Sequence, residues 1–192
     1  MRIYGDRRSG NCLKVQYTAD HLGLAYDWED VDIMSGGSRT ADFLARNPAG
    51  QVPVVVFDDG RVLTQSNAII LYLAEGSALI PTDPYDRAKM LEFMFYEQYS
   101  HEPYIAVCRF QKLYLGKTDE ELDPEKRERG YRALALMEAR LGDRAYLVGE
   151  RLSLADIALV AYTRLAPEGG FDLSPYLAIN DWIARVESGL GI

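Results

Sequence analysis

The first 76 residues alternate between short strand-like runs and segments with helical spacing. Residues 2–5 form an apolar run that ends at a glycine. Residues 25–33 alternate in polarity and are rich in aromatic and β-branched residues, so both segments predict strands. Between them, apolar residues recur on one helix face: Val15, Ala19 and Leu22. Gly23 fits the end of this helix, because glycine readily adopts the left-handed conformation found there.

The same alternation continues up to Gly76. Residues 38–48 predict a short helix that stops before a proline. Residues 52–64 contain two strands joined by Asp-Asp-Gly, which is a strong hairpin signal. Residues 66–76 predict a helix with Ser66 at its cap. The order is βαβ-α-ββα, and it predicts a mixed four-stranded sheet with one right-handed parallel crossover and an antiparallel edge.

The pattern changes after residue 76. Residues 77–85 contain two prolines and no periodicity, which predicts a linker. No strand-like run follows, and residues 86–192 consist of amphipathic helical segments around a very apolar one at 153–166. The fold class is therefore α/β followed by all-α, with domains at 1–76 and 86–192.

Composition narrows the possible functions. The chain has 192 residues and a net charge of −8, so it can build two cores but lacks the basic stripe of a nucleic-acid binder. No apolar stretch approaches the length of a membrane span, and the charged start lacks the apolar core of a signal peptide. Cys12 and Cys108 lie far apart, which indicates neither a disulfide framework nor a metal site, and favours a reducing cytoplasm.

Three short segments contain residues that packing alone does not explain: Ser9-Gly10-Asn11-Cys12, Gln51-Val52-Pro53 and Thr64-Gln65-Ser66. The first and third open helices, whose free N–H groups and partial positive charge attract anions. The proline in the second removes a ladder donor, so the residue before it can offer its backbone to a peptide-like ligand. If the segments share one edge of the sheet, a ligand with a thiolate at one end and a carboxylate at the other would bridge them.

Four segments then carry a family resemblance: SGNCLKV, NPAGQVPVV, LTQSNAIILYLA and GERLSLADIALVAY. In this order and spacing they resemble the glutathione S-transferase superfamily, over essentially the whole chain. The resemblance implies a thioredoxin-like glutathione-binding domain and an all-helical domain that holds a small hydrophobic electrophile. It also implies a cytoplasmic homodimer that uses glutathione as cosubstrate and needs no metal, nucleic acid or membrane.

The resemblance assigns roles to the glutathione-binding segments. It implies a cis peptide bond before Pro53 and backbone pairing of Val52 with the cysteinyl part of glutathione. Gln65 and Ser66 would hold the γ-glutamyl carboxylate and amine, and Gln51 would contact the glycyl end. In the second domain it implies an N-capping box, with a role in folding, formed by Ser153 and Asp156.

The first segment leaves the thiolate partner open. A free thiol has a pKa of about 8.5, and lowering it by about two units takes about 3 kcal/mol, which one donor and a helix N-terminus can supply. Similarity to theta and delta classes implies Ser9 as the donor, and similarity to the nu class implies Asn11. Cys12 falls at the second position of a thioredoxin-like pattern, which favours a packed residue over a mixed disulfide with glutathione.

The electrophile site is less defined by sequence. Candidates for its polar groups are His101, Tyr104 and Arg109, although an aromatic stripe at helical spacing is also typical of a core. The main hypothesis is a glutathione transferase that activates the thiol for attack on an electrophile. The alternatives are a glutathione-dependent disulfide or peroxide reductase, and a non-catalytic regulatory protein on the same fold.

Overall fold

The computed structural model describes residues 1–192, which divide into two compact units, Met1–Ser77 and Ala78–Ile192. The first unit contains a four-stranded sheet whose strands lie in the order β2-β1-β3-β4. β1 pairs parallel to β2 and antiparallel to β3, and β4 pairs antiparallel to β3. The predicted mixed sheet is therefore confirmed. Its strands are β1 (Arg2–Gly5), β2 (Asp27–Asp30), β3 (Val54–Val56) and β4 (Val62–Thr64).

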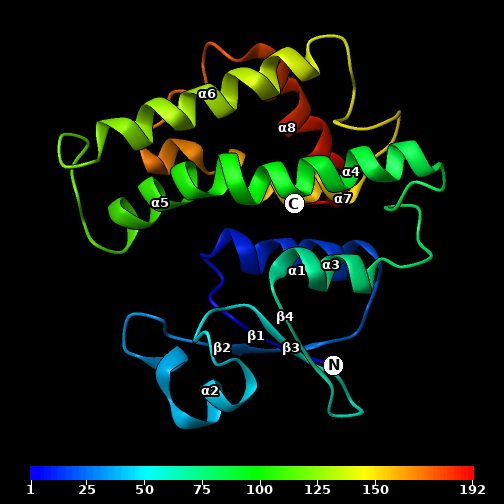
Figure 1. The fold of residues 1–192 in the computed structure, drawn as a ribbon, viewed down its shortest axis with the longest axis vertical. Coiled ribbons are helices and arrows are strands. Elements are labelled where there is room, and N and C mark those ends of the chain that lie inside the picture. The colour runs from blue at the N-terminus through cyan, green and yellow to red at the C-terminus, as the bar shows by residue number, and fades with distance from the viewer. The chain divides into compact units, whose positions relative to one another are not determined.

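Helices cover both faces of this sheet (Figure 1). α1 (Gly10–His21) and α3 (Ser66–Leu73) pack together on one face. The short turn η1 (Gly37–Arg39) and α2 (Ala41–Arg46) lie on the other. Val54 packs with Phe43 of α2. The next residue, Val55, points to the opposite face because side chains alternate along a strand, and it pairs with Ile3.

Several predicted boundaries were wrong: the helix predicted at 38–48 spans only Ala41–Arg46, and the one predicted at 66–76 ends at Leu73. The strand expected at 25–33 is limited to Asp27–Asp30, because only these four residues pair with β1. The helix expected to be capped by Ser66 starts at that residue, and its N-cap is Gln65. Gln65 has φ +68°, a left-handed conformation that is rare outside glycine. The helix end expected at Gly23 is confirmed, since this glycine has φ +64°.

The second unit is all-helical, as predicted. It contains α4 (Pro84–Tyr96), a π-helical turn η2 (Glu97–His101), α5 (Glu102–Leu113), α6 (Pro124–Leu141), α7 (Leu154–Thr163), η3 (Ala166–Gly169) and α8 (Leu177–Leu190). α4, η2 and α5 form one nearly continuous helix (Figure 1). Pro103 does not interrupt it, because it lies in the first turn of α5, where proline is tolerated. No helix combines the length and the apolar character needed to cross a bilayer.

α7 forms the core of this unit, and all ten of its residues are buried. The predicted capping box is present: Asp156 Oδ2 accepts hydrogen bonds from the amide and the hydroxyl of Ser153, at 2.9 and 2.8 Å. Its other oxygen accepts from the Leu147 amide and from Trp182 Nε1 of α8, both at 2.9 Å. One buried carboxylate thus joins the loop before α7, the start of α7 and α8.

Candidate functional site

The sheet register brings the three candidate segments of the first unit to one end. Tyr4 near the end of β1 pairs with Val54 at the start of β3, which pairs with Thr64 at the end of β4. The chain that follows β1, the chain that precedes β3 and the chain that follows β4 therefore lie side by side. These are the segments that hold residues 9–12, 51–53 and 65–66.

A side-chain hydrogen bond joins the starts of α1 and α3. Ser66 Oγ donates to Asn11 Oδ1 at 3.0 Å, although 55 residues separate them. Ser9 is the N-cap of α1, with an extended backbone and no side-chain hydrogen bond that caps the helix. The hydrogen bond therefore joins two helix N-termini, and a helix N-terminus favours the binding of anions.

The same Asn11 oxygen accepts a second hydrogen bond. Lys14, one turn further along α1, places its Nζ 2.9 Å from Asn11 Oδ1. The Lys14 side chain has no exposed surface. Sequence reasoning missed this lysine, because a lysine in an amphipathic helix usually extends into solvent.

The segment before β3 has the backbone expected of it. The Val52–Pro53 peptide bond is cis, as the resemblance implied. The Gln51 side chain is exposed, and the Gln51 backbone carbonyl accepts a hydrogen bond from Asn47 Nδ2 at 2.7 Å. Asn47 Oδ1 also accepts from the Ala49 amide at 3.2 Å. Asn47 thus shapes the loop that presents Gln51 and Val52; the Asn-Pro pair at 47–48 was the sequence signal for it.

Gln65 combines an exposed side chain with the unusual φ of +68°. Such a conformation costs about 1–3 kcal/mol in a residue other than glycine, and it is found mostly at functional sites. Here the positive φ of Gln65 turns the chain from β4 into α3. The exposed Gln65 side chain therefore lies next to the N-terminal amides of α3.

Cys12 is a packed residue with an inert thiol. Its side chain has no exposed surface, and burial raises the pKa of this thiol to about 12, against opposing hydrogen bonds from the Asp6 backbone and the Ser9 hydroxyl. A side chain at Gly5 would come within 3.0 Å of the sulfur and 2.9 Å of the Trp28 ring. The sulfur therefore fills a closed space beneath the β1–α1 loop.

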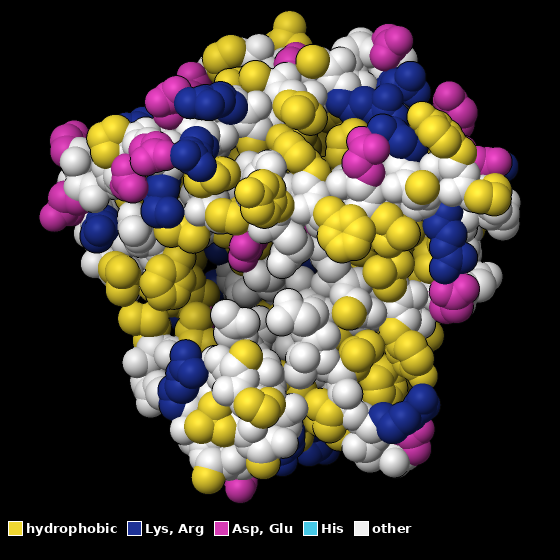
Figure 2. Space-filling model, viewed as in Figure 1, with side chains coloured by type: hydrophobic (Ala, Val, Ile, Leu, Met, Phe, Trp, Pro, Cys, Tyr) yellow, Lys and Arg dark blue, Asp and Glu magenta, His cyan; other side chains and the backbone are white.

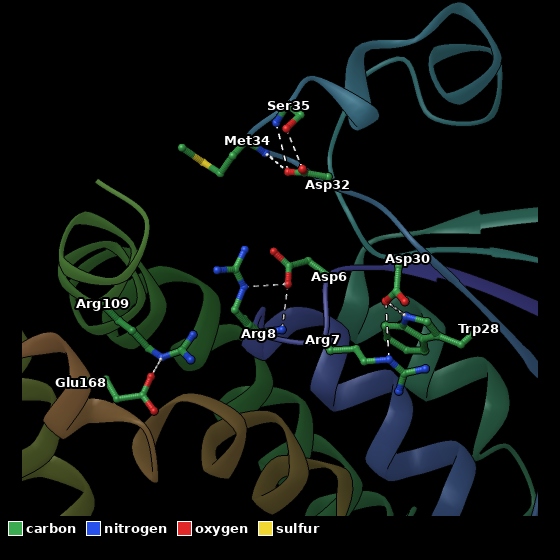
Figure 3. A network of polar contacts seen from close by, with 10 residues as sticks. All are labelled: Asp6, Arg7, Arg8, Trp28, Asp30, Asp32, Met34, Ser35, Arg109 and Glu168. Atoms are coloured by element: carbon green, nitrogen blue, oxygen red, sulfur yellow. Dashed lines mark hydrogen bonds and ion pairs between the residues drawn. The ribbon is translucent and has the colours of Figure 1, made fainter. Parts of the chain in front are cut away.

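The two arginines of the β1–α1 loop pair with carboxylates of β2 and of their own loop (Figure 3). Arg7 stacks on the Trp28 ring, 4.6 Å from its centroid, and lies 3.5 Å from Asp30 Oδ1. Arg8 Nε lies 3.5 Å from Asp6 Oδ1. These carboxylates offset the positive charge that the two arginines bring to the site.

In the helical unit one candidate pocket residue, Tyr104, lines a groove, and the other two, His101 and Arg109, are buried. Tyr104 lines a groove of about 420 Å³ with Tyr96, Ser100, Arg129, Arg132, Ala133 and Leu136. Its hydroxyl accepts from Arg129 Nη1 at 3.0 Å. Figure 2 shows hydrophobic and charged side chains intermingled over the helices of this unit.

His101 and Arg109 lie on the buried side of the helix. His101 has no exposed surface, and its Nε2 lies 2.9 Å from Thr163 Oγ1 in the core. The expectation that His101 lines a pocket is therefore wrong. Arg109 lies eight positions further along, about two helical turns, so both residues lie on the buried face of the helix. Arg109 is 5% exposed and pairs with Glu168 at 2.7 Å (Figure 3). A pocket role for Arg109 stays a prediction.

The fold and the site together define a thioredoxin-like unit with a cis-proline at one end of its sheet, followed by a helical unit. Comparison with known proteins identifies the family. Residues 8–75 match the model of the glutathione S-transferase N-terminal domain, and residues 86–189 match that of the C-terminal domain. The chain belongs to the glutathione S-transferase family.

Individual relatives agree with this assignment. The chain is 51% identical to a glutathione S-transferase from Pseudomonas fluorescens Pf-5, whose crystal structure superposes with a TM-score of 0.94 over 97% of this chain and 94% of that one. It is 32% identical to glutathione S-transferase 3 of Zea mays, over 81% of this chain and 73% of the relative. A maleylacetoacetate isomerase from Methylobacterium extorquens AM1, crystallised with malonate and GSH, is 27% identical with a TM-score of 0.84 over 100% of this chain and 94% of that one.

Proposed function

We propose that this protein is a glutathione transferase that binds glutathione in the first unit and activates its thiol with Ser9 and Asn11. The observation that carries the proposal is the hydrogen bond between Ser66 and Asn11, which holds two helix N-termini together at the sheet end that also bears the cis Val52–Pro53 bond. Glutathione is an anion with a peptide backbone and a thiol, so it matches all three parts of this site.

The proposed placement of glutathione follows from those parts. The γ-glutamyl carboxylate lies at the free amides of α3 beside Gln65 and Ser66. The cysteinyl part pairs with the backbone of Val52, and the glycyl end reaches Gln51. This order places the sulfur at the start of α1, where Ser9 and Asn11 lie.

The reaction begins with loss of the thiol proton to solvent. The Ser9 hydroxyl and the Asn11 amide donate to the resulting thiolate, and the N-terminus of α1 adds a favourable dipole. The sulfur electron pair forms a bond to an electrophilic carbon of a small hydrophobic substrate, and the leaving group departs with its own electron pair. The protein contributes a lowered thiol pKa and proximity, and Cys12 takes no part.

We assign the electrophile to the helical unit, with Tyr104 and Arg109 as its candidate polar contacts, and we place the enzyme in the cytoplasm. We also propose a homodimer. The support for it is a set of exposed aromatic side chains in the helical unit, with Phe95 69% and Tyr99 83% exposed. Such residues are enriched where proteins associate.

A second candidate is a glutathione-dependent disulfide or peroxide reductase, in which the thiolate attacks sulfur or oxygen. The observation that favours it is the pair of hydrogen bonds from Lys14 and Ser66 to the Asn11 carboxamide oxygen, because similarity to the nu class implies a role for this residue. A panel of haloaromatic, disulfide and hydroperoxide substrates separates the two reactions by their turnover numbers.

Calorimetric titration with reduced glutathione tests the proposal, followed by conjugation of a haloaromatic substrate. We expect saturable binding, and a ~10–10³-fold loss of turnover in Ser9→Ala with little change in affinity. The matched control is Ser174→Ala, an exposed serine of the helical unit. A wild-type protein that binds no glutathione would refute the proposal and favour a non-catalytic regulator on this fold.

A further inference from the structure

We propose that Lys14 is a positioning residue, which sets the polarity of the Asn11 carboxamide so that its nitrogen, rather than its oxygen, faces the sulfur of glutathione. This inference rests on the proposed function, because it concerns the same thiol site. It assigns a role in thiol activation to a buried lysine that does not itself contact the sulfur.

The argument starts from hydrogen-bond chemistry. A lysine ammonium donates hydrogen bonds and accepts none. The Asn11 atom 2.9 Å from Lys14 Nζ is therefore the carboxamide oxygen. Since the carboxamide is planar, with its oxygen and nitrogen on opposite sides of one carbon, the nitrogen points away from Lys14. The identity of these two atoms, which geometry alone rarely settles, is thus fixed by the lysine.

Ser66 cannot fix this polarity. Its hydroxyl lies 3.0 Å from the same Asn11 oxygen. A hydroxyl both donates and accepts, so Ser66 would bond equally well to an Asn11 side chain turned the other way. Of these two partners, Lys14 alone distinguishes the two orientations.

The polarity set by Lys14 extends to Ser66. Because the Asn11 oxygen only accepts, Ser66 must donate its single hydroxyl proton to it. The Ser66 oxygen then offers its lone pairs to the ligand, as the ammonium of a γ-glutamyl group requires. One lysine thereby gives the site a donor for the thiolate at Asn11 and an acceptor for the ammonium at Ser66.

The burial of Lys14 supports a specific role. Its side chain has no exposed surface, and a buried ammonium is costly unless its hydrogen bonds are satisfied. An apolar residue would fill the same position on α1 without that cost. The lysine also brings a positive charge to within one turn of the helix start, where a thiolate would lie.

Two substitutions test the inference. Lys14→Met keeps much of the side-chain volume but removes the donor and the charge. Asn11→Asp keeps an acceptor for Lys14 and Ser66 but replaces the amide nitrogen by an oxygen. Lys89→Met is the control, because Lys89 forms its ion pair with Glu92 in the helical unit. The readout is the pKa of bound glutathione, from the ultraviolet absorbance of its thiolate as a function of pH.

We expect Lys14→Met to raise the pKa of bound glutathione by about one unit, which corresponds to one charge-assisted hydrogen bond. Turnover below that pKa should fall about tenfold and recover as the pH rises, a pattern that a purely structural role would not produce. Asn11→Asp should raise the pKa further, and Lys89→Met should match wild type.

The outcomes separate the two proposals. If wild type binds no glutathione, the proposed function fails and the inference fails with it. If wild type binds and lowers the thiol pKa, but Lys14→Met leaves that pKa unchanged, the inference is overturned and the proposed function stands, with Ser9 as the donor. If Lys14→Met does not fold, Asn11→Asp decides: an unchanged thiol pKa in that variant overturns the inference.

Discussion

Replacing Asp156 by alanine should strongly destabilise the helical unit. The carboxylate has no exposed surface and accepts four hydrogen bonds, from the Leu147 amide, the Ser153 amide and hydroxyl, and Trp182 Nε1. A buried donor that loses its acceptor costs about 1–3 kcal/mol. The four together therefore predict a loss of at least about 4 kcal/mol, against a total domain stability of about 5–15 kcal/mol.

Two further substitutions divide this loss into parts. Asp156→Asn keeps the oxygen that serves Leu147 and Trp182 but turns an amide nitrogen toward the Ser153 amide, so we expect a loss of about 2 kcal/mol. Trp182→Phe removes one donor only, and we expect about 1–2 kcal/mol. Asp143→Ala is the control, because Asp143 is 87% exposed.

Urea unfolding followed by far-ultraviolet circular dichroism measures all four variants, and the midpoint shift at constant slope gives the free-energy change. The expected order of destabilisation is Asp156→Ala, Asp156→Asn, Trp182→Phe, Asp143→Ala. The reasoning would be refuted by an Asp156→Ala protein within about 1 kcal/mol of wild type, or by Asp156→Asn being as destabilised as Asp156→Ala.

Four further outcomes are expected. Iodoacetamide should leave Cys12 and Cys108 unmodified in the native protein and label both in urea, because neither side chain has exposed surface. Detection by mass spectrometry of a label on either cysteine of the native protein would contradict this. Stability should fall above about pH 9, because the unfolded Cys12 thiol ionises there while the native pKa is about 12. The native state then binds more protons, which costs about 2 kcal/mol by about pH 10.5, and Cys12→Ala should make the fall of the urea midpoint with pH smaller over this range. Glu138→Ala should lower stability by about 1–3 kcal/mol, because the Glu138 carboxylate accepts hydrogen bonds from the Ala178 and Ile179 amides and so caps the start of α8. An unchanged urea midpoint would show that this cap does not contribute to stability. Tyr99→Glu should shift sedimentation from dimer to monomer, because Tyr99 is 83% exposed, and unchanged sedimentation would show that this face is not the interface.

The elements of the fold were predictable because periodicity reports burial directly. The first helix follows from its apolar spacing and its end from Gly23, and the burial of α7 follows from its nearly continuous apolar sequence. The strand at 25–33 was predicted too long, because alternation continues beyond the residues that pair with β1. The alternation of polar and apolar residues indicates which side chains are buried. It does not indicate where the neighbouring strand ends.

The site was predictable only as segments. The cis bond before Pro53 followed from the resemblance, and the start of α1 from its capping residues. The contact between Asn11 and Ser66 joins positions 55 residues apart, and local sequence carries no trace of it. Lys14 was missed because a lysine is usually solvated, and His101 was misplaced because its aromatic and polar neighbours conceal that it lies on the buried helix face.

At the proposed site, the backbone would bind glutathione and the side chains would set the pKa of its thiol. The cis peptide bond and the free amides of α3 belong to the backbone, so side-chain substitutions that spare the fold leave them in place. In the proposed mechanism, Lys14 and Asn11 act together with Ser9 in setting the polarity around the sulfur. Exchanges of Lys14 or Asn11 should therefore alter the pKa of the bound thiol while glutathione binding persists. On this proposal, exchange of one or two residues weakens thiol activation while the site proposed to hold glutathione stays in place.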